Sequence, residues 1–223
     1  RFILCGGQGR ITLVVRSGLI VHPNRGPILI DTGYGPRVTT GSGRSLLLRP
    51  YAGAINPDLQ QGQSPLDLLA AHGFAAADVR LALITHLHAD HVGYLADLPN
   101  ARFITDGQTG GTVRQGVFSE LLPHDFAAHQ TDLRRSPLVP LPLGLGHGYD
   151  VLGDGTVLGV PLPGHAPGHF GLLFPGETPL LYAVDASWVL SAIEPGLMPG
   201  FPTSLIASDR NALQQTAQML RRF

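Results

Sequence analysis

The sequence ALITHLHADHVG, residues 82–93, places three histidines and one aspartate directly after an apolar run. The run over 79–84 is mostly aliphatic and predicts a buried strand that ends near Thr85. Polar side chains at the edge of a core are unfavourable unless they bind a partner. Neutral imidazoles and carboxylates are the ligands that zinc and similar cations take in proteins. The stretch therefore predicts a metal site at the end of a strand.

The spacing within this stretch predicts two neighbouring cation positions. Side chains two residues apart on an extended segment point to the same side, so His86 and His88 can share one cation. Asp90 and His91 can then turn toward a second position beside the first. Two cations about 3.5–4 Å apart can bridge one hydroxide and clamp an ester or phosphate oxygen. The pattern is typical of a binuclear hydrolase.

Further ligands must come from elsewhere, because one short segment cannot complete two coordination shells. The turn LPGHAPGHFG contains His165 and His169 between two predicted strands. LLYAVDAS places Asp185 at the end of an apolar strand, and ILIDTG ends in Asp31 in the same way. A carboxylate in such a position is expected to be paired or metal-bound.

The length allows one sizeable domain or at most two small ones, and we expect a single domain over residues 1–223. The 223 residues are 43% hydrophobic, which is enough for a packed core. The formal net charge is −1 with no basic block, so no nucleic-acid partner is expected. The single cysteine, Cys5, excludes an intramolecular disulfide and is expected to be a small buried residue in an early strand.

No run is long and apolar enough to span a bilayer, and no signal peptide is visible. We therefore expect no membrane partner and a cytoplasmic location, although a chain that begins with Arg1 leaves the native N-terminus open.

The sequence predicts strands at the start of the chain, then helices that alternate with strands, and then strands again. We expect strands over 11–30, a long loop over 34–63, a helix over 64–73 capped by Ser64, a short helix over 94–98 and a strand over 101–105. Residues 106–136 are expected to be mostly helical. Two hairpins over 149–163 and 169–187 follow, and an amphipathic helix over 208–223 closes the chain, with Leu213, Ala217 and Leu220 on one face.

The motifs LIDTG, ITHLHADHVG, PGHAPGH and YAVDAS, in this order, resemble those of the metallo-β-lactamase superfamily over about residues 11–210. The resemblance implies an α+β fold, a four-layer αββα sandwich with the metals at one edge between two sheets. It implies a first cation on His86, His88 and His165, and a second on Asp90 and His91.

The same resemblance implies that Asp185 bridges both cations. It gives Asp31 and His169 supporting positions, in which a His–Asp hydrogen bond can orient a ligand. Two zinc ions are expected, with iron or manganese as alternatives.

Two departures from the family pattern concern the site. Members usually carry a last histidine after the terminal helix, so the domain is expected to be cut short at its C-terminus. Signal lactonases of the family carry a tyrosine three residues after the bridging aspartate, where this chain has Trp188. An indole can line an apolar pocket but has no phenolic proton. The roles of Trp188 and of His124, a candidate for the pocket wall, stay open.

The implied chemistry is hydrolysis of a lactone, ester or thioester in a small-molecule substrate by a metal-bridging hydroxide. Asp90 is expected to orient the hydroxide and then to pass a proton to the leaving group. Lactonases and glyoxalase II-like thioesterases both resemble the chain. The alternatives are a mononuclear iron enzyme similar to persulfide dioxygenases, and a non-catalytic family member that binds a partner. The composition and the 34–63 segment are compatible with a homodimer.

Overall fold

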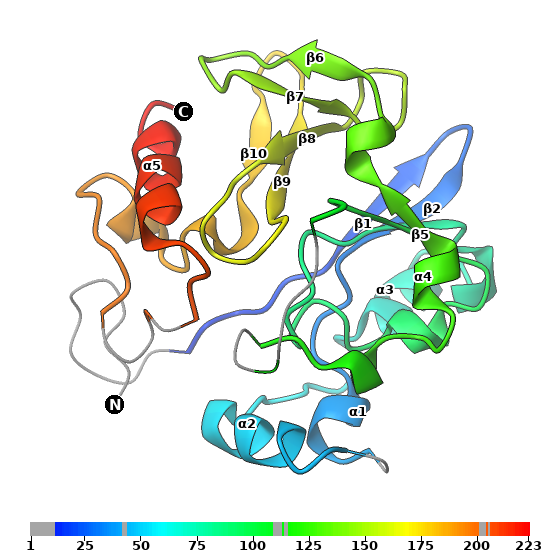
Figure 1. The fold of residues 1–223 in the computed structure, drawn as a ribbon. Coiled ribbons are helices and arrows are strands. Elements are labelled where there is room, and N and C mark those ends of the chain that lie inside the picture. Colours follow the sequence, from blue (N-terminus) through cyan, green and yellow to red (C-terminus); the bar gives the residue numbers. More distant parts are fainter. Residues whose placement is uncertain (1–11, 42–43, 109–112, 114–115, 201–203, 205) are drawn as a thin grey trace. The chain divides into compact units, whose positions relative to one another are not determined.

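The computed structural model describes residues 12–41, 44–108, 113, 116–200, 204 and 206–223. Cys5 lies outside the described residues. The chain folds as two compact units (Figure 1). Unit 2 comprises Val14–Thr105 and Gly111–Thr131, and unit 1 comprises Arg1–Leu13, Asp106–Gly110 and Asp132–Phe223. Each unit carries its own five-stranded sheet.

The sheet of unit 2 brings two strand ends together at one edge. Its order is β1-β2-β3-β4-β5, and β1 pairs antiparallel with β2, whereas β2, β3 and β4 are parallel. Ile30 at the end of β2 pairs with Leu83 at the end of β3. Because parallel strands present their carboxyl ends at the same edge, the residues that follow these two strands become neighbours. The strands are β1 (Gly18–His22), β2 (Gly26–Ile30), β3 (Leu81–Leu83), β4 (Arg102–Thr105) and β5 (Gln130–Asp132).

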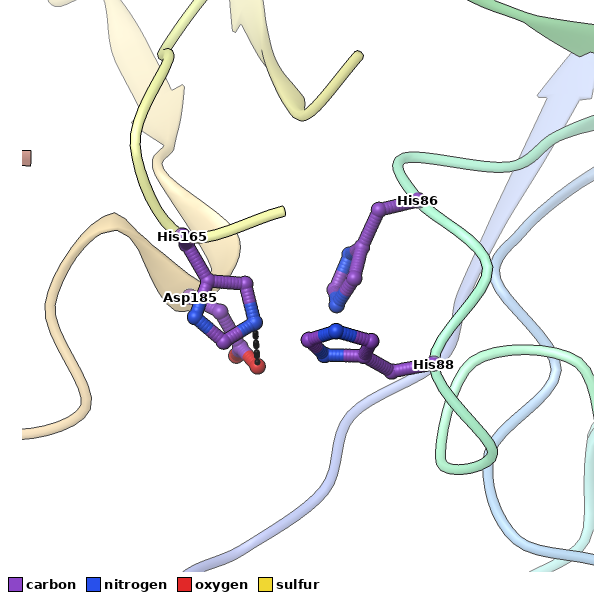
Figure 2. A group of neighbouring side chains, drawn as sticks. All are labelled: His86, His88, His165 and Asp185. Carbon is purple, nitrogen blue, oxygen red and sulfur yellow. Dashed lines mark ion pairs between the residues drawn. The ribbon is translucent and has the colours of Figure 1, made fainter. Parts of the chain in front are cut away.

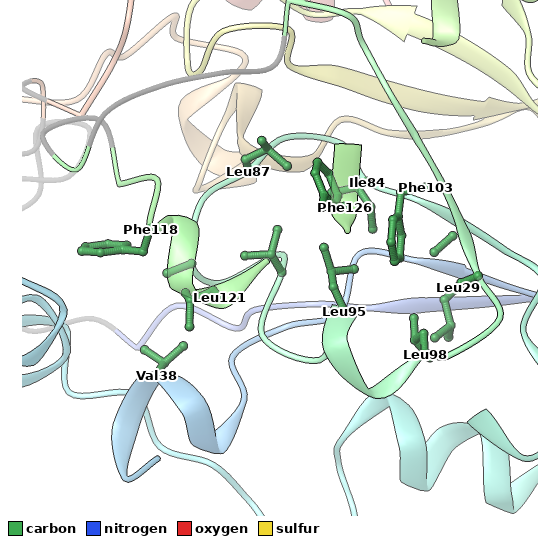
Figure 3. Close-up of a cluster of buried hydrophobic side chains, with 14 of the residues drawn as sticks. Leu29, Val38, Ile84, Leu87, Leu95, Leu98, Phe103, Phe118, Leu121 and Phe126 are labelled. Carbon is green, nitrogen blue, oxygen red and sulfur yellow. The ribbon is translucent and has the colours of Figure 1, made fainter. Parts of the chain in front are cut away.

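The helices of unit 2 are short: α1 (Pro36–Thr39), α2 (Leu48–Ile55), α3 (Pro65–Ala71) and α4 (Phe126–His129), with the 3₁₀ turns η1 (Ala76–Asp78), η2 (Leu95–Asp97) and η4 (Ser119–Leu121). As predicted, Ser64 is the N-cap of α3, where it forms a capping box with Asp67, and His72 caps the other end of the helix. The core of this unit is drawn in Figure 3, where Leu29, Ile84, Leu95 and Phe103 pack together.

Unit 1 holds an antiparallel sheet of order β10-β9-β8-β7-β6. The two predicted hairpins are confirmed, since β7 pairs with β8 and β9 with β10. The elements are β6 (Leu138–Pro140), β7 (His147–Asp150), β8 (Leu158–Pro161), β9 (Phe170–Phe174), β10 (Leu180–Tyr182), α5 (Arg210–Leu220) and the turns η5 (Leu133–Arg135), η6 (Val184–Ala186) and η7 (Leu190–Ala192). The predicted apolar face of α5 is buried, at Leu213, Ala217 and Leu220.

Three expectations about the elements were wrong. Residues 12–17 lie outside any strand, and Val14 is 65% exposed, because β-propensity alone does not supply a neighbouring strand. The segment 34–63 is not a plain loop, since it contains α1, begun at Pro36, and α2, which buries Leu48. The described part of 106–136 has only short helical turns and β5.

Among the described residues, no helix combines the length and the apolar character that crossing a membrane requires.

Candidate functional site

Unit 2 gathers four predicted ligands in the turn that follows β3. The imidazoles of His86, His88 and His91 are buried, at 0%, 4% and 3% exposure, and Asp90 is partly buried. The ring centroid of His86 lies 4.4 Å from that of His88 and 4.1 Å from that of His91. Figure 2 shows how His86 and His88 project from this turn with their rings close together. Three buried imidazoles in contact form a cluster of metal-ligating groups rather than an apolar core.

Asp31 organises this turn from the end of β2. One carboxylate oxygen accepts from the backbone N–H of Thr85 at 2.8 Å. The other accepts from the Thr85 hydroxyl at 2.9 Å and from Nδ1 of His91 at 2.8 Å. Asp31 is fully buried and has a φ of 49°, a left-handed conformation that aspartate tolerates better than most residues other than glycine. The three hydrogen bonds hold its carboxylate in place at the end of β2.

These hydrogen bonds determine the tautomers of two histidines. A carboxylate only accepts, so Nδ1 of His91 must carry the proton that it donates to Asp31. The Thr85 hydroxyl gives its single proton to Asp31, so toward Nδ1 of His86, 3.1 Å away, it can only accept. In both imidazoles Nε2 then carries the lone pair. That is the tautomer a metal ligand requires when Nε2 faces the cation.

The turn is joined by backbone hydrogen bonds to the DTGYG loop after β2. Thr32 donates to the carbonyl of His91 through both its N–H and its hydroxyl, and the N–H of Gly93 donates to the carbonyl of Gly33 at 2.9 Å. A Cβ on Gly93 would lie 2.2 Å from the nitrogen of Gly35. Only glycine permits this approach, which explains why both motifs contain glycine at these positions.

His88 is held by a separate segment of unit 2. It forms an isolated antiparallel bridge with Val117. A Cβ on the preceding residue, Gly116, would lie 3.1 Å from Cδ2 of His88, so the imidazole lies directly against the backbone there. The sequence contained no signal for this support, because Gly116 and Val117 belong to no recognisable motif.

Unit 1 carries the other two predicted ligands at one end of its sheet. The 162–169 turn joins β8 to β9 and contains His165, and Asp185 lies in η6 after β10. Nε2 of His165 lies 3.2 Å from Oδ2 of Asp185, the pair joined by the dashed line in Figure 2. His165 is 2% exposed, and Val184, beside Asp185, has a φ of 52°. A β-branched residue in this conformation is strained, as is common beside functional groups.

His169 supports this pair and is not itself placed as a ligand. Its Nδ1 donates to the carbonyl of Leu162 at 2.8 Å, and its Nε2 accepts from the backbone N–H of Asp185 at 3.3 Å. The two ring nitrogens thus bind backbone groups near the two ligands, the carbonyl of Leu162 and the N–H of Asp185. The supporting position expected for His169 agrees with this geometry.

Helix α5 fastens the His165 turn from its other side. Ser208 donates to the carbonyl of His165 through its N–H at 3.0 Å. The Thr216 hydroxyl donates to the carbonyl of Pro163 at 2.8 Å, and Thr216 is 3% exposed. The supporting roles of Thr85 and Thr216 were not predicted, because a threonine carries no chemical signal of its own until its hydrogen-bond partner is known.

The donor groups of each unit fit a tetrahedral cation. Two ligand atoms that each lie 2.0–2.1 Å from zinc are roughly 3.3 Å apart. The His165–Asp185 distance is 3.2 Å, and Nε2 of His91 lies 3.6 Å from Oδ2 of Asp90. Both pairs combine an imidazole with a carboxylate, the set that zinc, iron and manganese accept. His124, in contrast, is an exposed residue in a turn.

Comparison with known proteins identifies the class to which this fold and these residues belong. The family model of the metallo-beta-lactamase superfamily matches residues 10–223. The chain belongs to the metallo-beta-lactamase superfamily, and the resemblance seen in its motifs is confirmed.

Proteins named as lactonases are among the relatives. The N-acyl homoserine lactonase AttM of Rhizobium radiobacter is 34% identical over 205 residues, which cover 86% of this chain and 72% of the relative. A structure of a mutant of AiiA from B. thuringiensis, with N-decanoyl-L-homoserine bound at its active site, is 20% identical. The superposition covers 96% of this chain and 78% of the AiiA chain, with a TM-score of 0.66. AidC, a dizinc quorum-quenching lactonase, has a TM-score of 0.57 at 18% sequence identity. The superposition covers 91% of this chain and 65% of the AidC chain. These structures confirm the predicted α+β fold.

Proposed function

We propose that this chain is a metal-dependent hydrolase that opens a lactone ring, with esters and thioesters as related substrates. The observation that carries the proposal is the tautomer assignment around Asp31, which orients His86 and His91 as neutral Nε2 ligands. The relationship to AttM, an N-acyl homoserine lactonase, directs the substrate class toward lactones.

We assign two zinc ions to the ligand residues that the sequence motifs predict. By the ligand set that the family resemblance implies, His86, His88 and His165 would hold the first ion, Asp90 and His91 would hold the second, and Asp185 would contribute to both. The donor set supports this assignment, since each unit pairs a buried imidazole with a carboxylate at the spacing of two ligands on one ion. Homodimerisation and a cytoplasmic location stay predictions.

When bound, zinc supplies a water molecule of lowered pKa and a Lewis acid for the carbonyl oxygen. The chain's own residues then position the reactants. Asp90 is the partly exposed carboxylate of its group, so one oxygen can orient the attacking water while the substrate enters. The same carboxylate would take a proton from the attacking water and pass it to the leaving alkoxide oxygen as the C–O bond of the ring breaks.

Trp188 occupies the position at which signal lactonases of the family carry a tyrosine. Its indole meets His165 edge-on, with ring centroids 5.6 Å apart at 85°. It packs against a proposed ligand and cannot donate a phenolic proton to the substrate. We therefore expect turnover of signal lactones to be slower than that of a Trp188→Tyr variant.

Metal content and activity, measured together, test the proposal. Purified protein should contain about two zinc ions per chain by elemental analysis and should hydrolyse members of a lactone, ester and thioester panel. His88→Ala and Asp185→Asn should each lose metal and activity in parallel, whereas His124→Ala, which changes an exposed histidine, should lose neither.

Three results would count against the proposal. A single iron with no hydrolysis would indicate sulfur oxygenation, and a protein that takes up no metal would indicate a non-catalytic relative. Full metal content and turnover in His88→Ala would refute the ligand assignment.

A further inference from the structure

Two tyrosine hydroxyls of unit 2 form a hydrogen bond with each other. The hydroxyl oxygens of Tyr34 and Tyr51 lie 2.9 Å apart, and either group can be the donor. Tyr34 belongs to the DTGYG loop after β2, whereas Tyr51 lies in α2, 17 positions further along the chain. Both rings are half-buried and pack against the core of unit 2. The hydrogen bond therefore joins α2 to the loop.

The loop that carries Tyr34 is fixed to the ligand turn on both sides of this tyrosine. Before it, the carbonyl of Gly33 accepts from the N–H of Gly93 at 2.9 Å. After it, Gly35 lies so close to the turn that a Cβ would meet the carbonyl oxygen of Gly93 at 2.4 Å. The backbone of Tyr34 is thus held against the end of the turn that contains the ligands at 86–91.

Tyr51 reaches the same turn from the other side. Its ring contacts that of Phe118, with centroids 4.9 Å apart at an interplanar angle of 53°. Phe118 is only 1% exposed and lies in the core with Leu121 (Figure 3). It directly follows Val117, the bridge partner of His88. The ring contact therefore connects α2 to the segment that supports His88.

The orientation of His88 depends on where this segment lies. Its imidazole lies directly against the backbone of Gly116, and its own backbone pairs with that of Val117. A ligand held by packing keeps its geometry only while the supporting groups stay in place. Packed side chains and hydrogen bonds in contact can transmit such a constraint from one segment to the next.

We propose that Tyr34 and Tyr51 are positioning residues for His88. Their hydrogen bond joins the DTGYG loop, on one side of the ligand turn, to the 116–118 segment on the other. It thereby closes a ring of contacts around His88 within unit 2. The proposal rests on the proposed function for the assignment of His88 as a zinc ligand, whereas the contacts themselves stand on the geometry of unit 2.

Zinc titration against a competing chelator tests this role without any substrate. Tyr34→Phe and Tyr51→Phe each remove one hydroxyl and keep the ring. We expect each to weaken the zinc-binding step that His88→Ala weakens by about 3–10-fold, less than the 10–100-fold typical of a ligand's direct partner. The double variant should bind as weakly as either single one, because all three lack the same hydrogen bond. Tyr149→Phe, which changes a half-buried tyrosine in β7 of unit 1, is the matched control and should retain the affinity.

A second comparison tests whether the effect passes through His88. In a His88→Ala background, Tyr51→Phe should not weaken zinc binding further, because no imidazole remains there to be oriented. Thermal unfolding of the same proteins separates this effect from a loss of stability. Unaltered zinc affinity in both tyrosine variants, even with a lowered unfolding temperature, overturns the inference and leaves the proposed function standing. A further loss in the His88→Ala background does the same. Full zinc affinity in His88→Ala itself overturns the proposed function, and the inference with it.

Discussion

Nδ1 of His91 donates to the carboxylate of Asp31 at 2.8 Å, across 60 positions of sequence. The same carboxylate accepts from Thr85, whose hydroxyl oxygen faces Nδ1 of His86. One buried aspartate therefore sets the tautomers of two proposed ligands that belong to different cations. This dependence makes Asp31 a positioning residue for both cations.

Asp31→Asn should lower metal affinity without removing a ligand. The amide can donate as well as accept, so it no longer requires a proton on Nδ1 of His91. Loss of such a hydrogen-bonded partner typically lowers metal affinity about 10–100-fold. Zinc titration against a competing chelator measures the change. Asp58→Asn, at an exposed carboxylate, should leave the affinity unaltered. Equal affinities in both variants would show that the tautomers do not depend on Asp31.

Gly93→Ala should destabilise the protein, because the new Cβ would meet the nitrogen of Gly35 at 2.2 Å. Backbone atoms cannot move aside as side chains do, so we expect a loss of about 1–3 kcal/mol in the free energy of unfolding. Gly53→Ala is the opposite control. Gly53 lies in α2 with open space around it, and alanine there should add about 0.5–1 kcal/mol. Urea denaturation of both variants should give changes of opposite sign.

Gly116→Ala should disturb His88 specifically. The added methyl would press on the imidazole at 3.1 Å, at a residue whose φ of 78° already disfavours a side chain. Gly62→Ala introduces the same backbone strain, at a φ of 77°, with nothing within 4 Å. Both variants should lose stability, but only Gly116→Ala should lose bound zinc, as elemental analysis would show. Matching zinc content in the two variants would mean that His88 adapts or is not a ligand.

Thr216→Val should loosen the His165 turn. The substitution keeps the shape of the side chain but removes the partly buried hydrogen bond to the carbonyl of Pro163, which costs about 0.5–1.5 kcal/mol. We also expect weaker zinc binding, since His165 follows Pro163 by two residues. Thr178→Val, at an exposed turn position, should change neither quantity. Thermal unfolding and zinc titration separate the two effects, and a loss of stability with intact zinc affinity would limit Thr216 to a structural role.

Acid should lower the free energy of unfolding of unit 1 by protonating Asp132. The hydrogen bond from Arg134 holds the pKa of Asp132 below its usual value in the folded protein. A carboxyl group with a lowered folded pKa stabilises the protein above its unfolded pKa of about 3.9, and this contribution is lost as the pH falls through the folded value. Asp132→Asn should therefore lower the urea midpoint at pH 7 and change it less at pH 3. Asp58→Asn should show no such difference, and a midpoint deficit equal at both pH values would contradict the assignment.

The sequence by itself determined the residues and the family. The histidines and aspartate of the 85–93 turn, the PGHAPGH turn and Asp185 are recognisable because metal ligands must be these residue types at spacings that short turns can deliver. The helix at Ser64, both hairpins and the buried face of α5 were predictable, since each follows a local pattern of caps, turns or apolar spacing. Local β-propensity wrongly predicted a strand at residues 12–17, because this segment has no neighbouring strand to pair with.

Only the tertiary structure decided how the ligands are held. The parallel register of β2 and β3 makes Asp31 a neighbour of Thr85, and through Thr85 and His91 it defines the imidazole tautomers. The supports from Gly116, Val117 and Thr216 come from segments that carry no motif. Hydrogen bonds and van der Waals contacts act over a few ångströms in space, so residues distant in the sequence reveal such roles only after the chain has folded.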